Sequence, residues 1–339
     1  MSASDNNLNY SNTTVNTFYV LTNKNGAQLT VMPFGATVTS LKIPITNGEL
    51  IDVVLGFDSV EGYEKSFRLD GSPYMGATVG RYAGRIKDGK FELNGKKYQL
   101  AINNGANSLH GGIENFSKKN WDVDAVNTGK NQSITLSYVS VANEENYPGE
   151  LSVSLTYTLT EENELILNYK ATTTEDTIIN LTHHSYFNLE GHQSDVLNQD
   201  LVVHAQKVVE TREDGIPTGT ILEVANTVFD YRTAKKCPQN IDNTFVVENN
   251  DEVKATLFSP KTNLKMDVYT DQPGVHIYVG GNCGSDLKGK ENAAYHALSG
   301  ICFETQNFPD APNHANFPNA VLKKGDVYTQ KTIYKFESL

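Results

Sequence analysis

The sequence predicts an all-β protein built as a large antiparallel β-sandwich. Strand-like segments dominate the 339-residue chain, tight turns separate them, and no segment has the pattern of a long amphipathic helix. Many antiparallel strands joined by short turns pack as sheet on sheet. No linker-like stretch and no repeat of fixed period interrupts the chain. We therefore expect a single domain over residues 1–339.

The expected strands are rich in Val, Ile, Thr, Tyr and Leu. The clearest is 151–159, where every odd position is apolar, so that one face is buried and the other is wet. Asn94-Gly95, a preferred two-residue turn, joins two short strands, and 161–163 marks a second hairpin. In order, the main predictions are 17–22, 36–43, 90–93, 96–100, 133–141, 151–159, 164–171, 264–269 and 275–279.

Bulk composition limits the partners and the compartment. A net charge of −12 repels phosphate backbones and anionic membranes, so we expect neither nucleic acid nor membrane as a partner. Residues 1–7 are polar and do not resemble a signal peptide. Cys237, Cys283 and Cys302 are widely spaced and odd in number, which is typical of reduced structural cysteines. These features predict a cytoplasmic location.

The segment 300–310 is the most informative part of the chain. It reads as an apolar strand that ends on Glu304 and then opens into a polar, proline-stopped loop. We expect Glu304 to lie where a sheet edge meets solvent. A carboxylate there is held rigidly, is partly shielded from water and can reach a ligand, as a general base requires.

The segment 181–188 supplies a candidate acid. Because adjacent residues of a strand point to opposite faces, at most one of His183 and His184 faces a site. We interpret His183 as a hydrogen-bonded structural histidine, and His184, beside Ser185 and Tyr186, as the candidate for chemistry. There is no HExxH motif, no Cys pair and no regular His spacing, so no metal site is predicted.

Other polar, glycine-rich stretches hold further candidates. Arg81 and Arg85 offer guanidinium forks that suit sugar hydroxyls and carboxylates, although a solvated turn with surface arginines is the more common explanation of such a segment. His110 precedes two glycines and either points into a cleft or belongs to a surface turn. Asp242 lies between a loop and a strand, where a turn Asp is the simplest interpretation.

Taken together, these segments resemble the galactose mutarotase (aldose 1-epimerase) family. Six family motifs occur in order: GRYAGRI, NSLHGG, LTHHSYFNL, IDNTF, PGVHIY and FETQNFPD. Any one of them is weak, but six in order are specific, and they run from Gly80 to Asp310. The resemblance implies a large antiparallel β-supersandwich with its site in a cleft across one sheet.

The resemblance also implies an activity and a set of residues. The expected activity is interconversion of the α and β anomers of a free hexose such as galactose or glucose, without a cofactor. The resemblance places the catalytic base on Glu304 and the catalytic acid on His184. The substrate-binding residues that it implies are Arg85, His110, Tyr186, Asp242 and His276. The only partner expected is a small aldose sugar, bound by a monomer or homodimer.

Two departures from the family leave the preferred sugar open. Many members have Asn where this chain has Gly84, and Gln where it has His276. Three alternative functions also remain: a glycoside hydrolase that pairs Glu304 with Asp242 or Asp310, a sugar-binding module without catalysis, and a mutarotase for hexose 6-phosphates. The last would need an added basic pocket.

Overall fold

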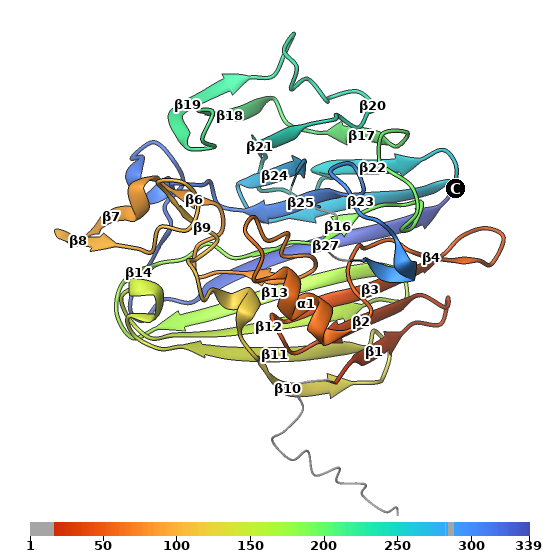
Figure 1. The fold of residues 1–339 in the computed structure, drawn as a ribbon, viewed down its shortest axis with the longest axis horizontal. Helices are drawn as coiled ribbons and strands as arrows, with labels where there is room; N and C mark the ends of the chain where they lie inside the picture. Colours follow the sequence, from red (N-terminus) through yellow and green to blue (C-terminus); the bar gives the residue numbers. More distant parts are fainter. Residues whose placement is uncertain (1–16, 282, 284–287) are drawn as a thin grey trace, which may run out of the picture.

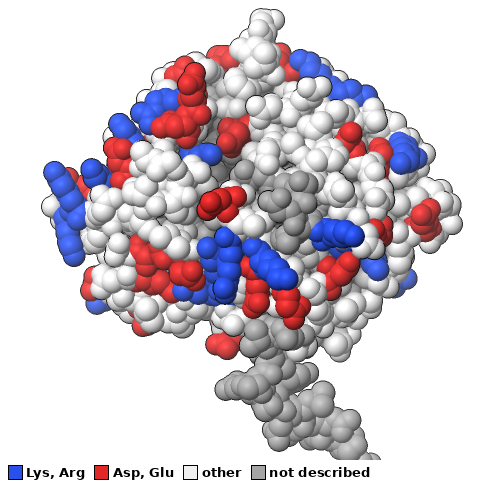
Figure 2. Space-filling view, viewed as in Figure 1, with Lys and Arg blue, Asp and Glu red and all other residues white. Residues whose placement is uncertain are grey.

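Antiparallel sheets make up most of the molecule (Figure 1), and basic and acidic side chains are interspersed on the face shown in Figure 2. The structure, a computed structural model, describes residues 17–281, 283 and 288–339. Residues 1–7, for which the sequence predicts no signal peptide, lie outside the described residues. Within the described part of the chain, no helix is long and apolar enough to cross a membrane.

The largest sheet has nine strands among the described residues, and the C-terminal strand lies near its centre. Leu165 pairs with Tyr334 and Met266 with Phe336, so the last strand joins two parts of the chain that are distant in sequence. In spatial order the strands are β10 (Asp122–Asn127), β11 (Ser133–Ser140), β12 (Leu151–Leu159), β13 (Glu164–Thr173), β27 (Tyr328–Ser338), β23 (Leu264–Thr270), β22 (Ala255–Ser259), β17 (Asp200–Val203) and β20 (Lys235–Lys236).

A second sheet carries most of the candidate site. Its six strands among the described residues are β16 (Tyr186–Phe187), β25 (Ile301–Gln306), β24 (Gly274–Val279), β21 (Ile241–Val246), β18 (Lys207–Thr211) and β19 (Pro217–Glu223), in that spatial order. Beside it lies a four-stranded sheet of β1 (Tyr19–Thr22), β2 (Gln28–Met32), β3 (Thr37–Pro44) and β4 (Leu50–Asp52).

Short elements complete the fold. The paired short strands are β5 (Thr78–Val79) with β15 (Thr182–His183), β6 (Arg85–Ile86) with β9 (Ser108–Leu109), β7 (Lys90–Leu93) with β8 (Lys96–Gln99), and β14 (Thr177–Ile178) with β26 (Val321–Leu322). Helix α1 (Val60–Ser66) begins after Ser59, whose side chain accepts from the Gly62 N–H. Short 3-10 helices are η1 (Lys87–Gly89), η2 (Phe116–Lys118), η3 (Glu144–Asn146), η4 (Lys290–Asn292) and η5 (Ala311–Asn313).

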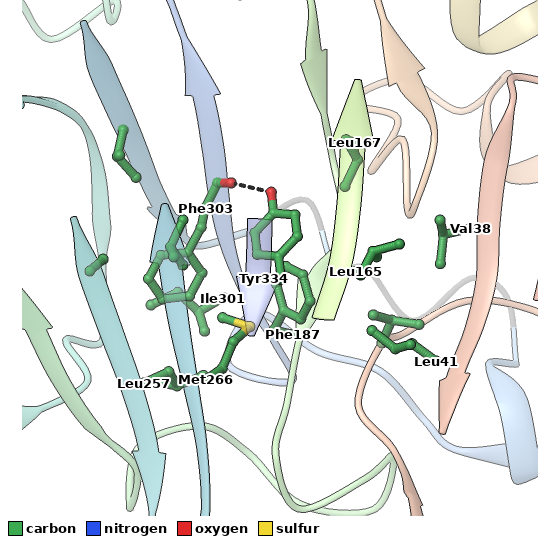
Figure 3. Close-up of a cluster of buried hydrophobic side chains, with 14 of the residues drawn as sticks. Val38, Leu41, Leu165, Leu167, Phe187, Leu257, Met266, Ile301, Phe303 and Tyr334 are labelled. Atoms are coloured by element: carbon green, nitrogen blue, oxygen red, sulfur yellow. Dashed lines mark hydrogen bonds between the residues drawn. The ribbon is translucent and has the colours of Figure 1, made fainter. Parts of the chain in front are cut away.

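The main hydrophobic core lies between the nine-stranded sheet and the two smaller sheets. Figure 3 shows side chains from all three meeting there, including Leu41, Leu165 and Phe303. The Tyr334 hydroxyl donates to the Phe303 carbonyl oxygen at 2.8 Å, so even the polar end of this ring is satisfied in the core. Burial of apolar surface between sheets is the main stabilising contribution in such a fold.

The predicted fold class and most predicted strands are confirmed. The cleanest alternation, in β12, buries every odd residue, and the Asn94-Gly95 hairpin forms between β7 and β8. All three cysteines are buried and free, as the sequence predicted. The cytoplasmic location stays a prediction.

The expected place of Glu304 at the end of a strand was wrong. Strand β25 continues to Gln306, and it lies between β16 and β24, inside its sheet. Glu304 is 2% exposed. The polar residues after Glu304 mimic a strand end in the sequence, but the backbone ladder with β24 runs through Thr305 and Gln306.

Candidate active site

A cavity of ≈ 670 Å³ opens over the face of the six-stranded sheet that points away from the core. Strand alternation explains its floor, because Glu304 and Gln306 line the cavity while Ile301 and Phe303 pack in the core. All seven site residues expected from the sequence line this cavity: Arg85, His110, His184, Tyr186, Asp242, His276 and Glu304. Folding therefore brings together side chains that are up to 219 positions apart in sequence (304 − 85).

Glu304 and His184 lie side by side in the cavity floor. The distance from His184 Nε2 to Glu304 Oε1 is 3.6 Å, and both side chains are almost fully buried. Glu304 Oε2 is also buried, and within the described residues it has no hydrogen-bond partner. A buried carboxylate oxygen without a donor is costly, which makes it a site for a hydroxyl group from a ligand.

The ring of His184 is held by its neighbours. Its Nδ1 lies 3.7 Å from Cys302 Sγ, and its ring stacks on Tyr186 with centroids 5.3 Å apart. His183 points the other way, into the core, where its Nε2 lies 2.7 Å from the Ser185 hydroxyl oxygen. The expectation that His183 is a buried, hydrogen-bonded histidine is confirmed.

His110 meets His184 edge to face, with ring centroids 5.4 Å apart. The Gly84 N–H donates to His110 Nδ1 at 3.2 Å, so that nitrogen has no proton and the hydrogen of the neutral ring is on Nε2. Burial, together with the nearby His184 and Arg85, holds the pKa of His110 well below its ordinary value. His110 is thus a neutral hydrogen-bond donor.

The backbone conformation and the packing at position 84 explain why this residue is glycine. Its φ is +78°, and an added Cβ would lie 2.9 Å from Pro309 Cγ. A side chain there would need both a left-handed backbone and movement of Pro309. In this chain the wall of the cavity at Gly84 is therefore backbone and proline ring.

Asp242 is held by two cationic side chains. His276 Nε2 lies 2.7 Å from Asp242 Oδ1, and Arg85 Nη1 lies 3.4 Å from Asp242 Oδ2. Arg85 is fixed in turn by donation from its Nε to Asn104 Oδ1 at 3.1 Å. Burial would raise the pKa of Asp242, but the hydrogen bond and charge of His276 and the charge of Arg85 outweigh it and hold the pKa well below its ordinary value.

Two other residues considered from the sequence lie elsewhere. Arg81 is 2% exposed and donates to the carbonyl oxygens of Pro148 and Gly149, so it is neither a surface arginine nor a cavity residue. Asp310 is fully buried outside the cavity lining, where it accepts from the Lys87 N–H and pairs with His314. In both cases a polar sequence context concealed burial.

The sequence analysis missed several residues of the site. Gln306 lines the cavity, and its buried Oε1 has no hydrogen-bond partner among the described residues. Its position, two residues after Glu304 on the same strand face, was the available signal. Asn104, also in the cavity lining, holds Arg85, whereas Thr244 and Cys302 contact His276 and His184 from outside the lining. No sequence pattern marks such contacts.

The arrangement of His110, His184 and Glu304 bears on metal binding. One ligand atom from each lies within 4.8 Å of the others. However, neutral His110 presents no free lone pair, because its Nδ1 accepts from Gly84 and its Nε2 carries the hydrogen. Metal binding would have to break the Gly84 contact, so the donor set fits a hydrogen-bonded ligand better than a cation.

Comparison with known proteins decides the family. Residues 17–335 match the family model for aldose 1-epimerase. The chain belongs to the aldose 1-epimerase family. It is 41% identical to galactose mutarotase of Bos taurus, covering 90% of each chain, and 33% identical to aldose 1-epimerase of Escherichia coli, covering 93% of this chain and 94% of that protein. The six-motif resemblance and the enzyme class inferred from it are confirmed.

Solved structures of aldose 1-epimerase relatives share the fold. A GalM/aldose epimerase homologue from C. elegans superposes with a TM-score of 0.88 at 31% identity, covering 96% of this chain and 99% of that chain. A galactose 1-epimerase from Lactobacillus acidophilus gives 0.81 at 26% identity, covering 95% and 94%. The family acts on aldose sugars.

Proposed function

We propose that this aldose 1-epimerase interconverts the α and β anomers of a free hexose such as galactose or glucose, with Glu304 as base and His184 as acid. The observation that carries the proposal is the unpartnered Oε2 of Glu304, in a cavity floor where the other oxygen lies 3.6 Å from His184 Nε2. The anomeric hydroxyl and the ring oxygen of an aldose are bonded to one carbon. Groups that act on both must therefore lie close together.

The chemistry follows from this pair. Glu304 takes the proton of the anomeric hydroxyl, the bond from that oxygen to the anomeric carbon becomes a carbonyl, and the bond from the carbon to the ring oxygen breaks. His184 gives its proton to the released ring oxygen. Rotation about the bond to the neighbouring carbon exposes the other carbonyl face, and the reverse transfers close the ring. Each positioned group is typically worth roughly 10²- to 10⁴-fold.

The remaining cavity residues suit a polyhydroxyl ligand. Arg85 offers donors, Asp242 offers an ionised acceptor, and neutral His110 offers a donor from Nε2. Such convergent groups hold the sugar in one orientation while its anomeric end meets Glu304. Tyr186 adds an aromatic wall that stacks on His184.

Glycoside hydrolysis fits this geometry poorly. That reaction needs a second carboxyl group, which in the retaining and inverting mechanisms serves as general acid or as nucleophile or base. Asp310 is outside the cavity lining and already paired with His314. Asp242 is engaged by both His276 and Arg85, and its lowered pKa makes it a poor proton donor.

The test is polarimetry of freshly dissolved α-D-glucose and α-D-galactose, with and without protein. Acceleration of either sugar toward its anomeric equilibrium supports the proposal, and the ratio of rates ranks the sugars. Measurable binding of both sugars without acceleration of either would contradict it and favour a binding module. Acceleration only of hexose 6-phosphates would overturn the free-hexose part, and Arg68 and Lys118 in the cavity lining are the side chains to substitute in that case.

A further inference from the structure

His276 lies in the cavity wall, but both its ring nitrogens already have partners. Nδ1 lies 2.8 Å from the Thr244 hydroxyl oxygen, and Nε2 lies 2.7 Å from Asp242 Oδ1. The side chain is only 11% exposed. A sugar hydroxyl therefore finds no free nitrogen on this ring, although the sequence placed His276 among the residues that touch substrate.

The sheet register also places His276 next to Glu304. Thr244 on β21, His276 on β24 and Glu304 on β25 are direct cross-strand partners, one after the other. Directly opposite side chains on one face of an antiparallel pair lie close enough to interact. His276 thus stands between two carboxylates, Asp242 on one side and Glu304 on the other.

We propose that His276 is a positioning residue: it fixes Asp242 for sugar binding and places a positive charge beside Glu304, without contacting the sugar itself. The proposal rests on the proposed function. Since His276 occupies Oδ1 of Asp242, the sugar is received at Oδ2, where Arg85 Nη1 lies 3.4 Å away. Thr244 fixes the far side of the ring and so the direction of Nε2.

The charges around the ring support a protonated His276. Burial lowers its pKa, but the hydrogen bond and charge of Asp242 and the charge of Glu304 outweigh burial and raise the pKa above its ordinary value. Arg85 acts in the opposite direction, and His110, which also interacts with this ring, is held neutral. Because His276 is the direct cross-strand partner of Glu304, the charge of the protonated ring lies beside that carboxylate.

A double-mutant cycle separates positioning from direct contact. We expect His276→Gln to raise KM for the sugar about tenfold, as for loss of a charge-assisted hydrogen bond. In an Asp242→Asn background the same change should have almost no further effect on KM, because His276 acts on sugar binding through Asp242. Full additivity of the two effects on KM would show that His276 contacts the sugar and would overturn the proposal.

The pH profile gives a second readout. In wild type, KM should rise as pH increases through the raised pKa of His276 and the ring loses its charge, and this rise should be absent in His276→Gln. A merely structural role of His276 would produce no such pH dependence. His314→Gln is the matched control, since His314 pairs with Asp310 at 3.1 Å outside the cavity lining and should change neither KM nor the profile. A rise in KM with pH that persists in His276→Gln would contradict the proposed charge effect.

The outcomes separate this inference from the proposed function. If wild-type protein does not accelerate mutarotation, the proposed function fails first. If wild-type protein is active but the effects of the two substitutions add, only the role of His276 fails. Circular dichroism checks folding of each variant, and His276→Asn replaces His276→Gln in the cycle if the longer amide is not tolerated.

Discussion

Two buried carboxylates, Asp52 and Glu304, show how this protein separates architecture from chemistry. Asp52, on β4, accepts from the Leu41 N–H, the Ser40 hydroxyl and Lys290 Nζ at 2.7 to 3.0 Å. Glu304 has one oxygen near His184 and a second with no hydrogen-bond partner within the described residues. A saturated carboxylate holds the fold together, whereas an unsaturated one is available to a ligand.

The surroundings of the two groups differ in the same way. Lys290 is 6% exposed and also donates to the Thr39 carbonyl oxygen, so Asp52 joins the segment around η4 to β3 and β4. Burial would raise the pKa of Asp52, but Lys290 and His192 outweigh it and lower the pKa far below its ordinary value. Both carboxylates are thus buried, and they differ in how many hydrogen bonds and charged partners each one has.

After substitution of Glu304, His184→Gln should cause the largest loss of activity. Loss of the proposed acid is expected to lower kcat roughly 10²- to 10⁴-fold. Polarimetry measures kcat, and a folded variant that keeps most of its kcat would remove His184 from the mechanism.

Asp52→Asn should do the reverse, with loss of stability and little change in rate. The substitution leaves Lys290 buried without its charge partner, which costs about 3–5 kcal/mol for pairs of this kind. Urea unfolding measures the free energy of unfolding, and kcat is expected to stay within about twofold when the protein is folded.

The matched control for Asp52 is Asp124→Asn. Asp124 accepts from the Ser137 hydroxyl at the surface, and its removal should change stability by less than about 0.5 kcal/mol. Equal losses of stability at the two positions would show that the Asp52 cluster has no special structural role.

Low pH should destabilise the folded protein, in part because His183 is buried in its neutral form. Burial, with a smaller contribution from His184, lowers the pKa of His183 from 6.5 to about 3. As pH falls below 6.5, His183 becomes protonated in the unfolded chain but stays neutral in the folded protein. The free energy of unfolding therefore decreases as pH falls toward 3. His110 contributes in the same direction.

Wild type should therefore lose stability with a slope of up to about 1.4 kcal/mol per pH unit for each such histidine. His183→Gln should reduce this slope between about pH 6.5 and 4, before most aspartates titrate. Urea unfolding at several pH values gives the slope. An unchanged slope in the variant would mean that His183 is not kept neutral by burial.

Local features of the fold were predictable from the sequence, and long-range ones were not. Alternation identified β12 and β13, and the Asn94-Gly95 turn identified a hairpin, because those signals depend on neighbours in sequence. The placement of β27 between β13 and β23 depends on partners more than 60 residues away, and no local pattern encodes it.

In the candidate site, too, local features could be predicted from the sequence, and features that depend on distant segments could not. Opposite pointing of His183 and His184 follows from strand geometry and could be predicted. The burial of Arg81, the mid-strand place of Glu304 and the engagement of both His276 nitrogens depend on side chains from distant segments. Partners of this kind become visible only in three dimensions.

The most direct test of the central claim is the mutarotation rate of Glu304→Gln at saturating sugar. Glutamine keeps the shape of the side chain but cannot accept the proton, so kcat should fall at least roughly 10²-fold. The melting temperature should stay close to that of wild type, since Oε2 of Glu304 has no partner to lose among the described residues. A folded variant that keeps most of its kcat would contradict the account.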